Sequence, residues 1–345
     1  MRAFAPGRVN LIGEHTDYND GLCLPFAIER GVTVTAEPLS GSDEIEAHAL
    51  DLSEHDRFRL AAHVAPRNPG VPPGWRRFVL GAAAELRREG VELTPCRLEI
   101  AGRLPRGAGL ASSAALSVSL CLALCAVAGA EPPERLALAR LCSRIENDWC
   151  GQQTGLLDQL ASLYGQAGHA VRIDMRGPRL NSVELDLGGH LAATLDSGAS
   201  RSLAGSGYNE RRAECRRAAA ALGLDSLRDA RSDALAELPE PLRRRARHVL
   251  TENERVDAAV AALGRGDLAQ MGRLLDASHA SLRDDYEVSV PEVERAVAAC
   301  KEAGALGARI LGGGFGGSVL ALFPPGAEPP RGAVRVEPGP GARLS

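Results

Sequence analysis

Residues 105–116 read PRGAGLASSAAL, a glycine-rich loop that leads from a predicted strand at residues 98–101 into a long apolar helix beginning near Ser112. The glycines let the backbone approach an anion, and the free amide groups at a helix N-terminus bind phosphate. Two other interpretations fit this stretch taken alone. A dinucleotide-binding turn would use Gly107 and Gly109, but a serine stands at its third glycine position and no acidic residue at a strand end follows about 20 positions later. A serine-capped helix after a tight turn would need no ligand.

A second polar loop lies near the N-terminus, where residues 7–21 read GRVNLIGEHTDYNDG. Its polar positions hold three carboxylates, a histidine and an amide: Glu14, His15, Asp17, Asn19 and Asp20. Paired acceptors of this kind grip the vicinal hydroxyls of a neutral sugar, because those hydroxyls need acceptors once water is removed. A solvated turn and a metal site are the alternatives, although a metal site would lack a second histidine nearby.

Two further segments carry residues that are unusual for their surroundings. Residues 155–164 read GLLDQLASLY, so Asp158 stands among leucines on a predicted helix and needs either an ionic partner or a chemical role. Residues 311–318 read LGGGFGGS, in which glycines dominate the link between two apolar strands. That density of glycine implies close backbone approach, either to a phosphate or to another segment of the chain.

The order of the predicted elements favours an α+β fold. The first half contains strands at 9–12, 31–36, 98–101 and 170–174 and helices from about 112, at 133–150 and at 155–164. The second half opens on a strand at 191–195, continues with helices at 208–222, 242–263, 268–282 and 291–303, and ends in strands within 308–323 and at 333–337. Strands and helices do not alternate regularly, as they would in a doubly wound sheet.

A domain boundary is predicted within residues 176–189, which are rich in glycine and proline. We therefore expect an α+β domain over residues 1–185. It carries the polar loop at residues 7–21, here called the sugar loop, and the glycine-rich phosphate-binding loop at residues 105–116. A second α+β domain, over residues 186–345, carries the glycine-rich segment at residues 311–318, here called the third glycine-rich motif.

The composition excludes several partners and chemistries. The 345 residues include 40 basic and 44 acidic side chains, a net charge of -4, which predicts neither a nucleic-acid surface nor an anionic-membrane surface. Lys301 is the one lysine and stands at a predicted helix end, which excludes a Walker A loop, a protein-kinase lysine and a Schiff-base lysine. Any phosphate chemistry must therefore use backbone amides, arginine and metal.

The cysteines and the longest apolar stretch indicate the compartment. The eight cysteines form no C-x-x-C pair, so we expect them to be reduced core residues. The apolar stretch at residues 114–130 is interrupted by serines and predicts a buried helix rather than a membrane span. Together these features predict a cytoplasmic protein.

These segments together resemble the motifs of the galactokinase, homoserine kinase, mevalonate kinase and phosphomevalonate kinase (GHMP) superfamily, and in particular those of the galactokinase family. Residues 7–21 resemble the galactokinase signature, and residues 105–116 and 311–318 resemble the second and third superfamily motifs. The resemblance extends through residues 155–159, 201–212, 247–253 and 278–290 and covers roughly residues 3–323. It implies a two-domain α+β architecture with the active site between the domains.

The resemblance also implies ATP-dependent phosphorylation of the anomeric hydroxyl of α-D-galactose, with ATP and Mg²⁺ as cofactors. Arg8 and Asp158 resemble the family's catalytic pair. The residues that resemble its sugar contacts are Glu14, His15, Asp17, Gly155 and Tyr208. Those that resemble its nucleotide site are Trp75, Gly107, Ala108, Gly109, Leu110, Ala111, Ser112 and Ser113, and those on the magnesium side are Ser113 and Glu146.

Two alternatives stand beside this assignment. A related sugar kinase could act on N-acetylgalactosamine or arabinose, and a non-catalytic galactose sensor could use the same fold. In each case we expect small-molecule partners, here galactose and MgATP, and neither nucleic acid nor membrane. The expected assembly is a monomer or a weak dimer.

Overall fold

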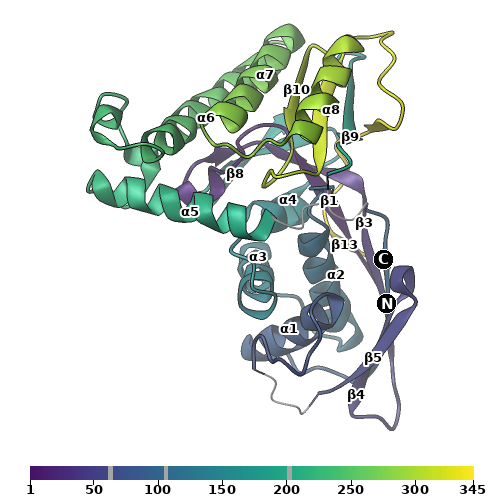
Figure 1. Ribbon diagram of the computed structural model, residues 1–345. Coiled ribbons are helices and arrows are strands. Elements are labelled where there is room, and N and C mark those ends of the chain that lie inside the picture. The colour runs from purple at the N-terminus through teal and green to yellow at the C-terminus, as the bar shows by residue number, and fades with distance from the viewer. Residues whose placement is uncertain (61–64, 105–107, 200–203) are drawn as a thin grey trace.

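The computed structural model describes residues 1–60, 65–104, 108–199 and 204–345. A six-stranded sheet with helices α1–α4 occupies the lower half of the molecule in Figure 1, and a four-stranded sheet with helices α6–α8 occupies the upper half. The two termini lie close together at the edge of the lower sheet (Figure 1). This mixture of antiparallel sheets and packed helices is the α+β class that the sequence predicts.

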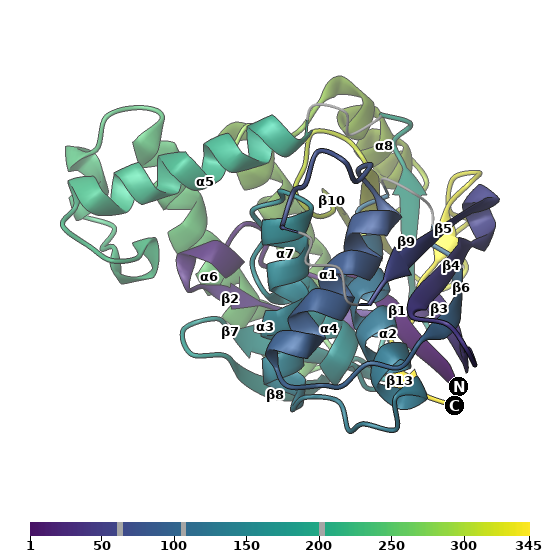
Figure 2. The ribbon, with the colours of Figure 1, turned by 90° about the horizontal axis from the view of Figure 1, so that it is seen from below.

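The six-stranded sheet has the order β13-β1-β3-β6-β4-β5 and is antiparallel except where β4 runs parallel to β6. Its strands are β1 (Arg2–Asn10), β3 (Pro25–Pro38), β4 (Glu44–Ala49), β5 (Glu54–Arg59), β6 (Cys96–Gly102) and β13 (Arg343–Leu344). The helices on its covered face are α1 (Trp75–Arg88), α2 (Ser112–Val127), α3 (Arg135–Arg144) and α4 (Leu157–Tyr164). In β4 and β6 buried and less buried residues alternate, as expected of a sheet covered on one face (Figures 1 and 2).

Helix α2 is the centre of this half because it is apolar on every side and packs against β1 and β3 as well as α1, α3 and α4. A helix without a polar face must be buried all round, as the sequence predicts for this stretch. Within the described residues, no helix has the length and apolar character that crossing a membrane requires.

The other half combines the sheet β10-β11-β9-β12 with four long helices. The strands are β9 (Leu191–Asp196), β10 (Gly307–Ile310), β11 (Ser318–Phe323) and β12 (Val334–Arg335). The helices are α5 (Ala204–Ala221), α6 (Leu242–Leu263), α7 (Leu268–Asp284) and α8 (Pro291–Glu302). Helix α5 extends away from the sheets, to the left in both Figure 1 and Figure 2.

Two predicted elements differ from the structure. The glycine- and proline-rich stretch at 176–189 contains strand β8 (Arg179–Glu184), which forms a three-stranded sheet with β7 (His169–Asp174) and β2 (Leu22–Cys23). The single helix predicted at 133–150 ends as α3 and continues as a π-helical turn, Ile145–Trp149. In the described part of the chain, the other short helical turns are 3₁₀ and span Asp17–Asn19, Leu50–Leu52, Leu227–Asp229 and Ala234–Glu237.

One buried apolar cluster joins the two halves. It combines Val9 and Phe26 of the first sheet with Val256 of α6 and Leu320 of β11, each at most 1 % exposed. The boundary between residues 185 and 186 therefore stays a prediction. All eight cysteines are free thiols and seven of them are buried, as predicted.

Candidate active site

A cavity of about 440 Å³ lies where strand β1, the N-terminus of α2, the N-terminus of α4, helix α5 and the loop between β10 and β11 meet. Most of the residues predicted for the site line it: Arg8, Glu14, His15, Asp17, Gly109, Leu110, Ala111, Ser112, Ser113, Glu146, Gly155, Asp158 and Tyr208. These residues come from segments up to 200 positions apart in the chain (residues 8 to 208). The fold thus brings the separate sequence motifs to one cavity.

Arg8 and Asp158 form an ion pair in the cavity wall. The Arg8 guanidinium donates from Nε to Asp158 Oδ1 at 2.9 Å, and its Nη2 lies 2.7 Å from the same oxygen. A further Arg8 nitrogen donates to the carbonyl of Gly109, in the glycine loop. Burial alone would lower the pKa of Arg8, but the charges of Asp158 and Glu14 outweigh it and raise that pKa. Arg8 is therefore a fixed cation that joins the carboxylate at the start of α4 to the glycine loop.

The N-terminus of α2 opens onto the same cavity. Ala111, the residue before the helix, has a left-handed backbone (φ 59°), and no side chain caps the first turn. The first amide groups of a helix have no partner within the helix and carry the positive end of its dipole. Because Ser112 and Ser113 line the cavity at this point, the arrangement suits a phosphate group.

Glu14 and His15 are buried residues of the sugar loop, each 3 % exposed. Burial alone would raise the pKa of Glu14, but the charges of Arg309 and Arg8 hold it below its ordinary value. Burial lowers the pKa of His15 to about 3, so the imidazole is neutral at physiological pH. His15 Nδ1 is 2.7 Å from the hydroxyl of Tyr18, and its buried Nε2 has no hydrogen-bond partner within the described part of the chain. The free Nε2 belongs to a residue of the cavity wall and is available to a ligand hydroxyl.

The Asp17 side chain lies against Gly155, which has no Cβ to displace it. A Cβ placed on Gly155 would lie 2.1 Å from Asp17 Oδ2, so only glycine accommodates the carboxylate where it is. Burial, followed by the charges of Asp158 and Glu14, raises the pKa of Asp17 to about 6. A half-buried carboxyl group of this kind can accept hydrogen bonds from the hydroxyls of a ligand.

The third glycine-rich motif approaches the sugar loop rather than standing apart from it. The Gly312 amide donates to Glu14 Oε1 at 2.7 Å, and a Cβ on Gly313 would lie 2.9 Å from the Tyr208 ring. The Tyr208 ring in turn lies 5.4 Å from the His15 ring, centroid to centroid. Of the two interpretations of these glycines, close approach to another segment accounts for Gly312 and Gly313.

Glu146 lies on the π-helical turn and is 2 % exposed. Gln159 Nε2 donates to its Oε1 at 2.8 Å, and Thr154 donates to its Oε2 at 3.4 Å. Burial, with a further contribution from the charge of Asp158, raises the pKa of Glu146 to about 8. At neutral pH the Glu146 carboxyl group therefore favours its protonated form, unless a bound cation stabilises the charged form.

Comparisons with known proteins identify the family of this chain. A family model described as the galactokinase galactose-binding signature matches residues 1–38. Models of the GHMP kinase N-terminal and C-terminal domains match residues 77–166 and 259–337. A galactokinase of Roseiflexus sp. is 43% identical over 92% of this chain and 82% of its own length. The chain belongs to the galactokinase family.

Two further members of the galactokinase family agree with this. A galactokinase of Streptomyces coelicolor is 42% identical over 92% of this chain and 83% of its own. The structure of Lactococcus lactis galactokinase complexed with galactose superposes with a TM-score of 0.89 at 31% identity, covering 99% of this chain and 94% of that one. The resemblance and the α+β GHMP kinase fold predicted from the sequence are confirmed.

Of the described residues predicted for the galactokinase-family nucleotide site, Ala108 and Trp75 do not line the cavity. Gly107 lies outside the described residues. Ala108 is buried, 3 % exposed, beside the cavity. Trp75 is 7 % exposed at the start of α1, where its indole donates to Glu54 Oε2 at 2.8 Å and packs edge-on against Phe58. Its assignment to the adenine stays a prediction.

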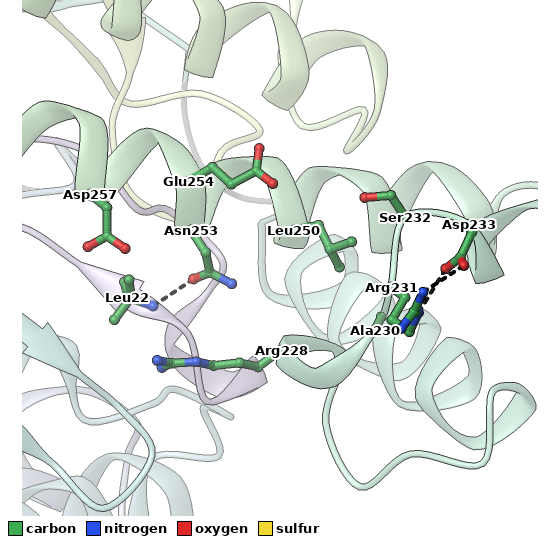
Figure 3. A pocket seen from close by; sticks show the side chains of 10 residues that line it. All are labelled: Leu22, Arg228, Ala230, Arg231, Ser232, Asp233, Leu250, Asn253, Glu254 and Asp257. Carbon is green, nitrogen blue, oxygen red and sulfur yellow. Dashed lines mark hydrogen bonds and ion pairs between the residues drawn. The ribbon is translucent and has the colours of Figure 1, made fainter.

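A second hollow, of about 630 Å³, lies between β2 and α6 and is shown in Figure 3. Several of its charged and polar side chains have partners: Arg231 pairs with Asp233 at 3.0 Å, and Asn253 accepts from the Leu22 amide at 2.7 Å (Figure 3). None of the predicted site residues that the structure describes lines it. The cavity around Asp158 is therefore the candidate active site of this galactokinase-family chain.

Several residues of the site are not indicated by the sequence. Gln152, Gln153 and Thr154 line the cavity from a polar stretch without a recognisable pattern. Asn209 also lines it, from the segment 201–212 that the resemblance includes but in which it assigns only Tyr208 to the site. Arg309, whose charge acts on Glu14, had a visible signal, because a lone arginine within the apolar strand ARIL needs a buried partner.

The raised pKa of Glu146 predicts a pH-dependent effect of Glu146→Gln on stability. Between the ordinary value of about 4.5 and about 8 the unfolded chain releases this proton while the folded chain keeps it. The free energy of unfolding therefore falls as pH rises through this window, by about 1.4 kcal/mol per pH unit. Glu146→Gln removes this loss, so its melting temperature minus that of the wild type should increase from pH 5 to pH 8 when a chelator is present. The same difference at both pH values would contradict the burial of an uncompensated Glu146.

Proposed function

We propose that the protein transfers the γ-phosphoryl group of ATP to the anomeric hydroxyl of α-D-galactose, giving galactose 1-phosphate and ADP. The observation that carries the proposal is the junction of three groups in one cavity. They are the Arg8–Asp158 ion pair, the acceptors Glu14 and Asp17, and the uncapped N-terminus of α2. The first suits activation of a hydroxyl, the second a neutral sugar and the third a phosphate chain.

The sugar side of the cavity is rich in acceptors and poor in free donors. Glu14 is an ionised acceptor, Asp17 is a second carboxyl group, and neutral His15 offers Nε2. Sugar hydroxyls that leave water need such partners, and a missing partner costs about 1–3 kcal/mol. This donor-and-acceptor balance supports a neutral hexose as the acceptor substrate.

Asp158 is the residue that we assign to the reacting hydroxyl. Phosphoryl transfer passes through a loose transition state, so positioning and charge neutralisation contribute more than a strong base does. Asp158 would orient the anomeric hydroxyl and accept its proton as the bond to phosphorus forms. Arg8 holds the Asp158 carboxylate in place and adds positive charge beside the transferred group.

The phosphate side uses backbone amides where other kinases use lysine. The amides at the start of α2 and the loop around Gly109 and Ala111 would bind the negative charge of the nucleotide. Gly109 and Ala111 both have positive φ, which turns the backbone of the loop sharply before the helix. This arrangement accords with a chain in which Lys301 is the one lysine and pairs with Asp276 at 2.7 Å.

The donor set fits Mg²⁺. Ser113 and Glu146 both line the cavity and supply oxygen atoms, which Mg²⁺ prefers, with one or two carboxylates and the substrate phosphates completing its shell. The pKa of Glu146, raised to about 8, indicates a carboxyl group that a cation would stabilise in its charged form. When bound, Mg²⁺ would neutralise charge on the β- and γ-phosphates.

Ser113→Ala tests the magnesium side. Because the hydroxyl is assigned to the cation and not to the sugar, the variant should need a higher Mg²⁺ concentration for half-maximal turnover, by about tenfold. The KM for galactose should stay within about twofold of the wild-type value. A Mg²⁺ titration of turnover measures both, and an unchanged midpoint would remove Ser113 from the metal site.

The identity of the sugar is tested by ADP release from purified protein with galactose, N-acetylgalactosamine, glucose, arabinose and mevalonate as acceptors. The proposal requires the highest kcat/KM with galactose. A preference for N-acetylgalactosamine or arabinose would support a related sugar kinase. Galactose binding without ADP release would support the sensor. A cytoplasmic location and a monomer or weak dimer belong to the same proposal.

A further inference from the structure

Arg309 is a fully buried arginine on strand β10, with an exposed fraction of 0%. Its Nη1 donates to the carbonyls of Asn10 and Leu11 at 2.8 and 3.0 Å. Its Nη2 lies 3.1 Å from Glu14 Oε1. A buried guanidinium is costly unless it is paired, so its position calls for an explanation beyond packing.

Glu14 receives two contacts from the same short segment of chain. Arg309 is the last residue but one of β10, and three residues later the Gly312 amide donates to Glu14 Oε1 at 2.7 Å. Both contacts use one carboxylate oxygen, which fixes the orientation of the side chain in the cavity wall. Of the charges that lower the pKa of Glu14, that of Arg309 has the largest effect, ahead of Arg8.

Other groups hold the backbone of this loop. Glu252 accepts the Gly13 amide at 3.0 Å, and His248 Nε2 lies 3.1 Å from the Glu14 carbonyl oxygen. The loop therefore keeps anchors when Arg309 is changed conservatively. Arg309 makes two kinds of contact with this part of the chain: the Nη1 bonds to the Asn10 and Leu11 carbonyls, and the ion pair with the Glu14 carboxylate. Of these, the ion pair is the contact with a side chain that lines the cavity.

We propose that Arg309 is a positioning residue for the sugar site, which holds the Glu14 carboxylate in the orientation that contacts a hydroxyl of the bound hexose. The inference rests on the proposed function, in which Glu14 is a sugar contact. Arg309 acts through Glu14 and does not itself line the cavity among the described residues. A lysine cannot replace it, because an ammonium is a point charge and cannot span two carbonyls and a carboxylate.

The test measures the dissociation constant of galactose by calorimetry, and the KM for ATP, in four proteins: wild type, Arg309→Lys, Glu14→Gln and the double variant. Arg309→Lys should weaken galactose binding at least about tenfold and change the KM for ATP by less than about twofold. In the Glu14→Gln background, Arg309→Lys should weaken galactose binding by less than a further factor of about two. The effects of two residues that act through one contact are not additive.

Arg245→Lys is the matched control. Arg245 is 1 % exposed and pairs with Glu214 at 2.7 Å and Glu287 at 2.6 Å, away from the cavity. We expect it to lower the melting temperature and leave galactose binding within about twofold of wild type.

Each outcome has a separate meaning. If Arg309→Lys behaves like the control, with a lower melting temperature and unchanged galactose binding, Arg309 is structural and the inference is wrong. If the losses of Arg309→Lys and Glu14→Gln simply add, Arg309 does not act through Glu14 and the inference is again wrong. If Glu14→Gln itself leaves galactose binding unchanged, the sugar assignment of the proposed function fails.

Discussion

Asp158→Asn should lower kcat for galactose at least about 100-fold, the low end of general acid–base effects. Asparagine keeps the shape of the side chain and one acceptor oxygen for Arg8. It removes the negative charge and the capacity to take the proton of the sugar hydroxyl. The KM for ATP should change little, because no contact of Asp158 with the N-terminus of α2 is required by the proposed reaction.

The same variant should keep its melting temperature close to that of the wild type. Arg8 stays compensated after the substitution, since the charges of Glu14 and Asp17 also act on it and a nitrogen of Arg8 donates to the Gly109 carbonyl. The matched control is Asp174→Asn, which removes a carboxylate paired with Arg228 at 2.7 Å outside the cavity. Asp174→Asn should lower the melting temperature and leave kcat unchanged.

The two quantities separate the possible roles of Asp158. If its role were only to neutralise Arg8, the free energy of unfolding should fall by about 3–5 kcal/mol while the folded enzyme keeps its turnover. Near-wild-type kcat in a well-folded Asp158→Asn protein would overturn the mechanism.

Gly155→Ala should raise the KM for galactose by about 10- to 100-fold, the range that corresponds to one or more lost hydrogen bonds to the sugar. The added Cβ would lie 2.1 Å from Asp17 Oδ2 and 2.9 Å from its Cγ, so the carboxyl group must move. The KM for ATP should stay near the wild-type value, because the displaced group is assigned to the sugar alone.

The Asp17→Ala background shows whether Gly155 acts through Asp17. Asp17→Ala alone should raise the KM for galactose far more than the KM for ATP. Adding Gly155→Ala to it should change little, since the atoms in conflict are gone and the nearest one left, Asp17 Cβ, would lie 3.3 Å away. Equal rises in the two KM values, or additive effects of the two substitutions, would exclude this role.

The elements that the sequence predicts well are those with strong periodicity. Helix α6 begins and ends at Leu242 and Leu263 as predicted, because an apolar repeat defines it, and α2 begins at Ser112 as predicted, because a glycine-rich loop precedes it. Strands β4 and β5 escape prediction since charged residues occupy their outer face, and the two residues of β13 carry no pattern of their own. The pairing of β13 with β1 is a property of the folded chain.

For the site residues too, local sequence motifs allow prediction, whereas contacts between distant segments do not. The sequence motifs supply Arg8, Glu14 and Asp158, but nothing in their spacing indicates that Arg8 also contacts the Gly109 carbonyl. Arg309 could have been recognised as a charge in an apolar strand, yet its partner lies 295 positions away in the chain (309 minus 14) and needs the fold to be identified. Long-range ion pairs of this kind depend on tertiary packing, which local patterns do not contain.

The most direct test of the proposed reaction is the position of the phosphate in the product that forms from galactose and ATP. Phosphorus NMR with proton correlation distinguishes the sites, because a phosphate on the anomeric carbon gives a doublet that correlates with H1. A phosphate on C2, C3 or C4 gives a doublet that correlates with the hydrogen of that carbon. A phosphate on C6 couples to two hydrogens and gives a triplet. Transfer to the hydroxyl held by Asp158 predicts the doublet that correlates with H1, formed by the wild type and at least about 100-fold more slowly by Asp158→Asn. A triplet, a doublet that correlates with another hydrogen, or an H1 doublet formed equally fast by both proteins would contradict it.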